Sequence, residues 1–135
     1  MDGRTLQIAT RRFADTLVAA PAGRIDHRSA ADFEAALTPL LDRISAHGGA
    51  LVLDFAGVEY ISSVGLRVLM IAAKRMKQQQ ALLAVAALQS VVAEIFTISR
   101  FDRILTVTGT LDAALALCSA AALEQYRASG SAPAQ

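Results

Sequence analysis

Short apolar runs alternate with longer amphipathic stretches along most of this 135-residue chain, and this alternation limits the folds that it can adopt. Residues 50–55 (ALVLDF) follow a glycine pair and are apolar at almost every position, which is typical of a strand buried on both faces of a sheet. Residues 81–86 have the same character. Because parallel strands need long crossovers between them, the alternation predicts an α/β fold.

Apolar residues recur at helical spacing in the stretches beside these runs. Between Ser29 and the pair Gly48-Gly49 they follow the i, i+3, i+4, i+7 pattern of one helix face, at Phe33, Ala36, Leu37, Leu40, Leu41 and Ile44. Ser29 is a suitable N-cap for this helix. Further helices are predicted over residues 64–79, 89–98 and 111–125.

Two short strands are predicted before the first helix, at residues 6–9 and 16–22, with Arg11, Arg12 and Asp15 in the connection of a hairpin. Pro21 has no N–H for a ladder bond, so it should lie at a strand end, a bulge or an unpaired edge. With a last strand at residues 104–108, we predict a mixed sheet of four to five strands with an antiparallel N-terminal hairpin and about four helices. One domain then covers residues 5–123, and residues 124–135 form a frayed C-terminal tail.

Composition and charge argue against several classes of function. The 13 basic and 12 acidic residues give a net charge of +1, which provides no general field for polyanions, so nucleic-acid binding is disfavoured. No apolar stretch is long and uninterrupted enough to match the roughly 20 helical residues that cross a bilayer, so no membrane insertion is predicted. The N-terminus lacks the apolar core of a secretory signal, which predicts a cytoplasmic location. The single cysteine, Cys118, cannot form an internal disulfide.

Two serines, Ser62 and Ser63, lie where a buried strand passes into the helix predicted from residue 64. The start of a helix has unpaired N–H groups and a partial positive charge, so a serine there can cap the helix, and a phosphate there would be held favourably. Gly65 has no Cβ and is expected to let another molecule approach the hydroxyl. Ser63 is therefore either a helix cap or a site of modification.

The following helix is expected to present Val68 and Ile71 on its outer face, among basic residues that include Arg67 and Lys74. Apolar side chains surrounded by bases suit a protein partner. Isolated apolar side chains are also common on ordinary surfaces, so both interpretations of this face stay open.

Familiar enzyme motifs are missing from the sequence. There is no Gly-x-Ser-x-Gly elbow around Ser63 and no Gly-x4-Gly-Lys-Ser/Thr phosphate loop. His27 could approach Ser63 as a base, whereas His47 is better placed to contact the last carbonyls of its helix. No group of His, Cys and carboxylate residues has the spacing of metal ligands. We therefore predict that the chain is not an enzyme and needs no cofactor or metal.

The segment VEYISSVGLRVLMIAAKRMK resembles the signature of the STAS domain, the family of bacterial anti-anti-sigma factors. Gly23-Arg24-Ile25-Asp26 resembles the family's Gly-x-Leu-Asp turn before the first helix, and LVLDFAGVEY resembles its central strand and following loop. The motifs occur in the expected order and separation. The resemblance extends from about residue 6 to residue 117.

This resemblance implies a cytoplasmic anti-sigma factor antagonist whose partner is an anti-sigma serine kinase. The kinase phosphorylates one serine, which falls on Ser63 here, and only the unmodified protein captures the kinase and thereby frees a sigma factor. A phosphatase would reset the switch. Ser62 occupies the position of an acidic residue in the family's common motif, and Val64 occupies that of a second hydroxyl residue. With Asp26 from the neighbouring loop and the helix face, the predicted partner-binding set is Asp26, Ser62, Ser63, Val64, Gly65, Arg67, Val68 and Ile71.

The two departures from the common motif keep a second function open. STAS-like domains also serve as subunits of lipid-transport complexes and as scaffolds of stress-sensing assemblies. The alternative prediction is therefore a STAS subunit of such a complex that does not switch.

Overall fold

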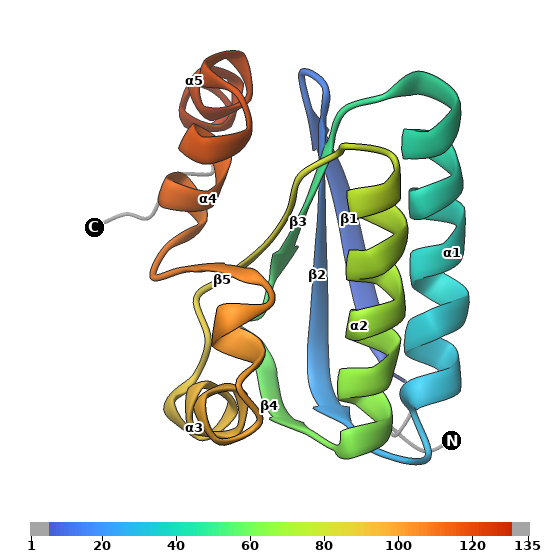
Figure 1. Cartoon of the computed structure of the whole chain (residues 1–135). Helices are drawn as coiled ribbons and strands as arrows, with labels where there is room; N and C mark the ends of the chain where they lie inside the picture. The colour runs from blue at the N-terminus through green and yellow to red at the C-terminus, as the bar shows by residue number, and fades with distance from the viewer. Residues whose placement is uncertain (1–5, 131–135) are drawn as a thin grey trace.

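The computed structural model describes residues 6–130 and contains a central sheet with helices on both faces (Figure 1). The hairpin β1 (Gln7–Phe13) and β2 (Thr16–Ile25) is followed by α1 (Ala30–His47). The remaining elements are β3 (Ala50–Asp54), β4 (Val58–Ile61), α2 (Ser63–Gln78), β5 (Leu83–Ala86), α3 (Ser90–Ile98), the 3-10 turn η1 (Phe101–Arg103), β6 (Thr106–Thr108), α4 (Leu111–Cys118) and α5 (Ala120–Ala128).

The sheet has the order β1-β2-β3-β5-β6, with β4 paired to β2 outside this path. β1 and β2 are antiparallel and all other pairs are parallel, which confirms the predicted mixed α/β fold with an N-terminal hairpin. Arg11 and Arg12 belong to β1 and not to the connection, because the hairpin turn contains only Ala14 and Asp15. The described residues form six strands where four to five were predicted. The additional strand is β4.

β2 pairs with two different strands along one of its edges. Its first residues, 16–19, pair with β3, and Gly23, Arg24 and Ile25 pair with β4. Pro21 lies in the gap between these two ladders, where its missing N–H removes no bond to β3 or β4. The prediction of an unpaired edge at this proline is therefore confirmed for this side of β2, while on the other side Pro21 is the register partner of Ile8 in β1.

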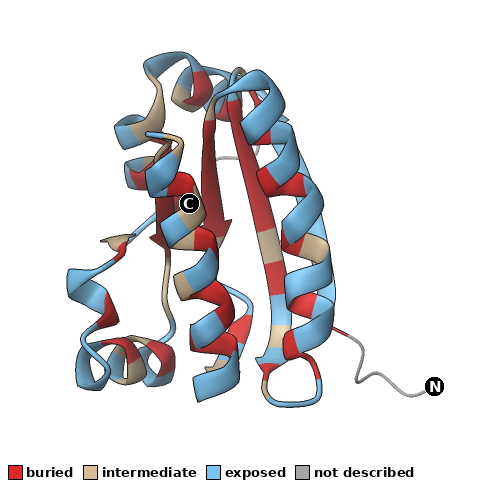
Figure 2. Cartoon of the chain, turned by 45° about the vertical axis from the view of Figure 1, so that its right-hand side comes forward, coloured by how far each residue is buried: buried red, intermediate tan, exposed pale blue. Residues whose placement is uncertain are grey.

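Two apolar cores lie on the two faces of the sheet. The larger one packs α1, α2 and α3 against the sheet, and it contains edge-to-face contacts of Phe55 with both Phe33 and Phe96, at 6.4 Å between ring centroids in each pair. The smaller one lies under α4 and α5, where Phe13 meets Tyr126 at 5.4 Å. Figure 2 shows the same division, with the buried sides of α1 and α2 toward the sheet and their other sides exposed.

The C-terminal part of the chain differs from the predicted single helix. Ser119 is extended, and its hydroxyl oxygen accepts a hydrogen bond from the Ala122 N–H at 3.2 Å, so it ends α4 and caps α5. α5 continues to Ala128 and buries Tyr126, so residues 124–128 are helical where a frayed tail was expected. Residue 5 and residues 131–135 of the predicted ranges lie outside the described residues.

Gly65 allows the first turn of α2 to lie directly on the ends of β2 and β4. A Cβ atom at this position would come within 2.8 Å of both Ile25 Cγ2 and Ile61 Cγ1, and within 3.2 Å of the Ile25 carbonyl oxygen. Both isoleucines are fully buried and have little room to move. Gly65 is itself buried, so the prediction that it opens access for another molecule is wrong. Its role is to let α2 pack closely against the sheet.

Gly65→Ala should therefore destabilise the protein even though alanine is the better helix former. Overpacking costs about 1–3 kcal/mol, which exceeds the gain of up to about 1 kcal/mol from helix propensity. We expect the free energy of unfolding, measured by urea denaturation, to fall by about 1–2 kcal/mol. Gly109→Ala is the matched control, because a Cβ there meets nothing within 4 Å, and it should change stability by less than about 0.5 kcal/mol. Equal effects of the two substitutions would contradict this account of Gly65.

Candidate functional site

The two serines at the start of α2 have different surroundings. Ser62 is the N-cap: its hydroxyl oxygen accepts a hydrogen bond from the Gly65 N–H at 3.2 Å, and its carbonyl accepts one from the Leu66 N–H at 2.9 Å. Ser63 is the first helical residue and is exposed. Its hydroxyl makes no hydrogen bond with any residue between 6 and 130. The interpretation of Ser63 as the cap is therefore wrong, because Ser62 caps α2 and Ser63 is the exposed residue after it.

Asp26 and the two serines are brought to the same edge of the sheet by the pairing of β2 with β4. Ile25 is the register partner of Ile61, and the Ser62 N–H donates to the Ile25 carbonyl at 2.8 Å. The residues that follow each strand, Asp26 and Ser62, therefore leave the sheet side by side. The resemblance predicted Asp26 beside Ser63, and the strand pairing brings it next to Ser62, the residue before Ser63.

The carboxylate of Asp26 is held within its own turn. Its Oδ1 accepts hydrogen bonds from the Arg28 N–H at 2.9 Å and the Ser29 N–H at 3.2 Å, and the bond from Arg28 is the largest of the effects that lower the pKa of Asp26. Arg24 lies 3.8 Å from Oδ2 and also stacks over the ring of Tyr60 at 4.5 Å. The turn therefore holds an ionised carboxylate in a fixed position where β2 ends.

Ser29 stands at the N-cap position of α1, but its side chain does not cap the helix. Its hydroxyl donates to the Arg24 carbonyl at 2.6 Å and accepts from the Asp26 N–H at 3.0 Å. The expected cap bond is missing because this buried hydroxyl is used to close the turn around Asp26.

The outer face of α2 is narrower than the sequence predicts. Val64 and Ile71 are 45% and 49% exposed, and Arg67 lies between them on the surface. Val68 is only 8% exposed and belongs to the larger core, so its predicted place on the outer face is wrong. The reason is that α2 packs against α1 as well as the sheet, as the 2.6 Å ion pair between Arg75 and Asp42 of α1 also indicates.

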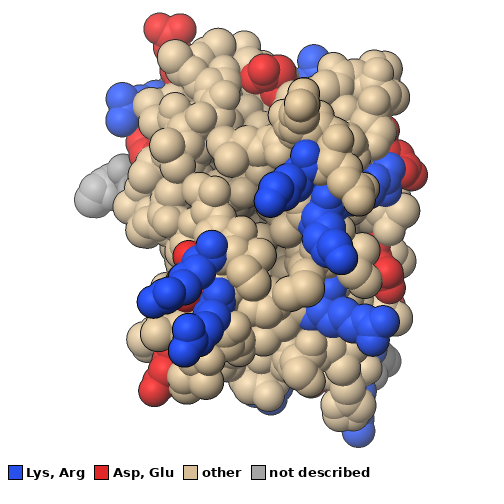
Figure 3. All heavy atoms as spheres, viewed as in Figure 1, with Lys and Arg blue, Asp and Glu red and all other residues tan. Residues whose placement is uncertain are grey.

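Basic side chains dominate the face of the molecule that α2 and α3 form. In Figure 3 several Lys and Arg side chains spread over this face, with few acidic side chains between them. Arg67 and Lys74 are the exposed bases of α2 nearest to Val64 and Ile71 along the helix. This face therefore suits a partner that presents carboxylates around an apolar contact.

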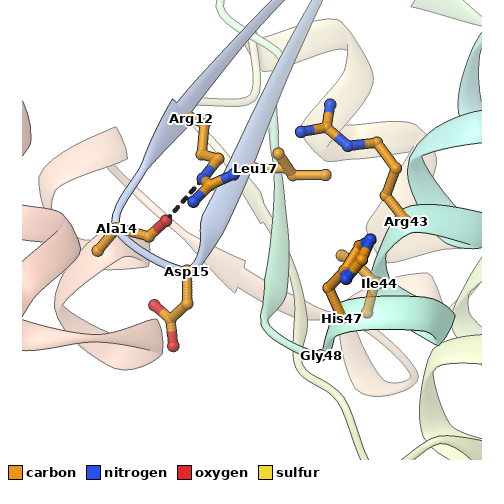
Figure 4. A pocket seen from close by; sticks show the side chains of 8 residues that line it. All are labelled: Arg12, Ala14, Asp15, Leu17, Arg43, Ile44, His47 and Gly48. Atoms are coloured by element: carbon orange, nitrogen blue, oxygen red, sulfur yellow. Dashed lines mark hydrogen bonds between the residues drawn. The ribbon is translucent and has the colours of Figure 1, made fainter.

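Among residues 6–130, the side chains of His27, His47 and Cys118 make no hydrogen bond with Ser62 or Ser63. His27 is exposed and makes no hydrogen bond with Ser63. His47 lies in the last turn of α1, at the far end of the sheet from Ser63, beside a surface hollow (Figure 4). Burial raises the pKa of the Cys118 thiol to about 11, which disfavours the reactive thiolate.

Residues 6–130 contain no group of three or more His, Cys, Asp or Glu side chains placed to hold a metal ion. Within the same range, every helix is too short or too polar to cross a bilayer.

Comparison with known proteins gives consistent matches. The family model for the STAS domain matches residues 7–114. BtrV of Bordetella bronchiseptica, named as a candidate anti-sigma factor antagonist, is 36% identical over 100 residues, which cover 74% of this chain and 84% of BtrV.

Solved structures share the fold at lower sequence identity. An anti-sigma factor antagonist from Mycobacterium paratuberculosis superimposes with a TM-score of 0.76 at 22% identity, covering 87% of this chain and 97% of that chain. The phosphorylated form of SpoIIAA, a Bacillus cell fate determinant, gives a TM-score of 0.61 at 12% identity, covering 84% and 98%. The family match over most of the sequence and the identity with BtrV show that this chain belongs to the STAS domain family.

Proposed function

We propose that this protein is an anti-sigma factor antagonist that captures an anti-sigma serine kinase while Ser63 is unmodified and releases it once Ser63 is phosphorylated. The observation that carries the proposal is the exposed Ser63 hydroxyl, which has no hydrogen-bond partner among residues 6–130. The name of BtrV supports the same role. Control of a sigma factor would place the protein in the cytoplasm.

The capture surface in this proposal consists of exposed residues around the start of α2. Val64 and Ile71 supply apolar contact and Arg67 supplies charge. Asp26 supplies a fixed carboxylate from the neighbouring turn. Gly65 and Val68 are buried, and the Ser62 hydroxyl is used as the cap. These three residues would therefore act by positioning the helix.

Phosphorylation would work through charge, without refolding. A phosphate adds about −1.5 to −2 charges and three acceptor oxygens, and the start of a helix favours an anion at that place. Arg67 lies four residues after Ser63, so it is on the same side of the helix and within reach of the phosphate. The modified surface would then repel the carboxylates of a partner that matches the basic face. A phosphatase that removes the group would restore binding.

The two departures from the family's common motif have physical consequences here. Ser62 keeps the capping function that an aspartate would also perform, but it places no negative charge beside the acceptor. Val64 exposes an apolar side chain where the motif has a hydroxyl. These departures favour the second candidate function, a STAS subunit of a lipid-transport or stress-sensing complex that does not switch.

Phosphorylation by the matching anti-sigma kinase tests the modification site. With ATP and the purified kinase, mass mapping should find one phosphate on Ser63 and none on the Ser63→Ala variant. Ser62→Ala is the control, because it should still be phosphorylated while losing about 1 kcal/mol of stability with its helix cap. Phosphate on another residue of the wild-type chain would overturn the assignment, and no phosphate at all would favour the non-switching function.

Binding of the same kinase tests the switch itself. Ser63→Asp should lower the affinity about 100-fold or more, since several kcal/mol of repulsion arise at a desolvated contact, and circular dichroism should show an unchanged fold. Ala120→Asp is the matched control, because residue 120 is the exposed first residue of α5. That variant should bind like the wild type. Retained tight binding by Ser63→Asp in calorimetry would contradict a charge-based switch.

A further inference from the structure

A second group of polar side chains lies at the other end of the sheet from Ser63. β2 begins at the hairpin turn and ends at Ile25, whose carbonyl is bonded by Ser62. Its ten residues span about 30 Å at roughly 3.3 Å per residue. Whatever binds beside the hairpin turn is therefore separate from the Ser63 surface.

A hollow of about 500 Å³ lies between the hairpin turn and the last turn of α1 (Figure 4). This volume lies within the range of roughly 300–1,000 Å³ that is usual for small-molecule sites. Leu17 and Ile44 are buried and give the hollow an apolar part. Its other lining residues are Arg12, Ala14, Asp15, Arg43, His47 and Gly48.

Three basic side chains border this hollow and come from two elements. Arg12 belongs to β1, and Arg43 and His47 lie one turn apart on α1. Figure 4 shows the guanidinium groups of Arg12 and Arg43 reaching toward Leu17 from opposite sides, while the Asp15 carboxylate points away from both. The Asp15 carboxylate instead accepts a hydrogen bond from the Thr16 hydroxyl at 3.5 Å.

No carboxylate among residues 6–130 pairs with these basic groups. Arg43 and His47 make no hydrogen bond or ion pair with residues 6–130. Arg12 donates its Nε–H to the Ala14 carbonyl at 3.0 Å, which orients the guanidinium and leaves its two terminal nitrogens free of bonds to those residues. Like charges that gather without a carboxylate between them repel one another, and a bound anion would relieve this repulsion.

The two walls of the hollow are fixed relative to each other. The Ala50 N–H donates to the Asp15 carbonyl at 3.1 Å and ties the hairpin turn to the start of β3. Gly49 has a φ of +107°, and a Cβ atom there would collide with the Asp15 carbonyl oxygen. The close approach of the hairpin to the end of α1 is therefore built into the backbone, which reduces the cost of ordering the site on binding.

We propose that this hollow binds a small, free organic phosphate, with the phosphate between Arg12 and Arg43 and the organic part over Leu17 and Ile44. Guanidinium groups match phosphate oxygens in two-point hydrogen bonds, which makes arginine pairs suited to this ligand class. The carbonyl end of α1 disfavours an anion on the helix axis. Helical side chains lean back toward the N-terminus, so Arg43 and His47 would hold the anion beside the last turn and away from that end.

Amide NMR titrations of the full chain at constant ionic strength test the proposal, with inorganic phosphate and phenyl phosphate as probes. Phenyl phosphate should give saturable shifts at Ala14, Leu17 and Gly48 and should bind several-fold more tightly than inorganic phosphate, because its ring covers the apolar part. Arg43→Gln should weaken binding at least about 10-fold, as expected for the loss of a charged hydrogen bond. Arg103→Gln removes the same charge from an exposed position of η1, away from both the hollow and the Ser63 surface, and should have no effect.

Three results would overturn the proposal. One is the absence of saturable shifts at the hollow. Another is an equal loss of affinity in Arg43→Gln and Arg103→Gln, which would indicate general charge screening. The third concerns the source of the phosphate: sedimentation with phosphatidylglycerol vesicles should not retain the chain. Retention that Arg43→Gln abolishes would assign the hollow to a lipid head group and contradict a free ligand.

Discussion

The parallel pairing of β2 with β4 is the interaction on which the candidate site depends. It aligns Ile25 with Ile61, and the bond from the Ser62 N–H to the Ile25 carbonyl extends this alignment by one residue. The Asp26 turn and the start of α2 are therefore neighbours although they are far apart in sequence. Gly65 completes the arrangement, because only a residue without Cβ lets the first turn of α2 rest on both isoleucines.

The close packing of α2 on the sheet divides the residues around the two serines into an inward-facing and an outward-facing group. Ser62, Gly65 and Val68 face inward and hold the helix in place. Ser63 and Val64 face outward, together with Arg67 and Ile71 further along the helix. A change in the charge of Ser63 can therefore alter the outer surface without disturbing the packing beneath it, which is what a binding switch without refolding requires.

Much of the fold was predictable from the sequence because its strands are nearly continuous apolar runs. The apolar runs at residues 50–55 and 81–86 contain β3 and β5, and the regular helical spacing after Ser29 belongs to α1. β4 was missed because its four residues, VEYI, are a very short run between a loop and a helix, and their strand pairs only with the end of β2. The break at Ser119 was missed because the surrounding alanines favour a helix on both sides.

The sequence located the candidate site in the segment around Ser62 and Ser63. The local pattern could not show which of its residues are buried, which cap the helix and which are exposed. Adjacent serines offer the same chemistry, and only the register of β2 with β4 decides which of them caps α2. Val68 was placed on the outer face because helical periodicity reveals one buried stripe, whereas α2 is covered by both the sheet and α1. The hollow beside Arg43 had no sequence signal, since Arg12 and His47 meet it only in the folded chain.

The structure of this protein in complex with the proposed partner, an anti-sigma kinase bound to nucleotide, would test the central claim most directly. We predict that the kinase buries Ser63, Val64, Arg67 and Ile71 and that the Ser63 hydroxyl points toward the transferable phosphate. A complex in which these side chains stay exposed while the kinase covers α4 and α5 would contradict the account.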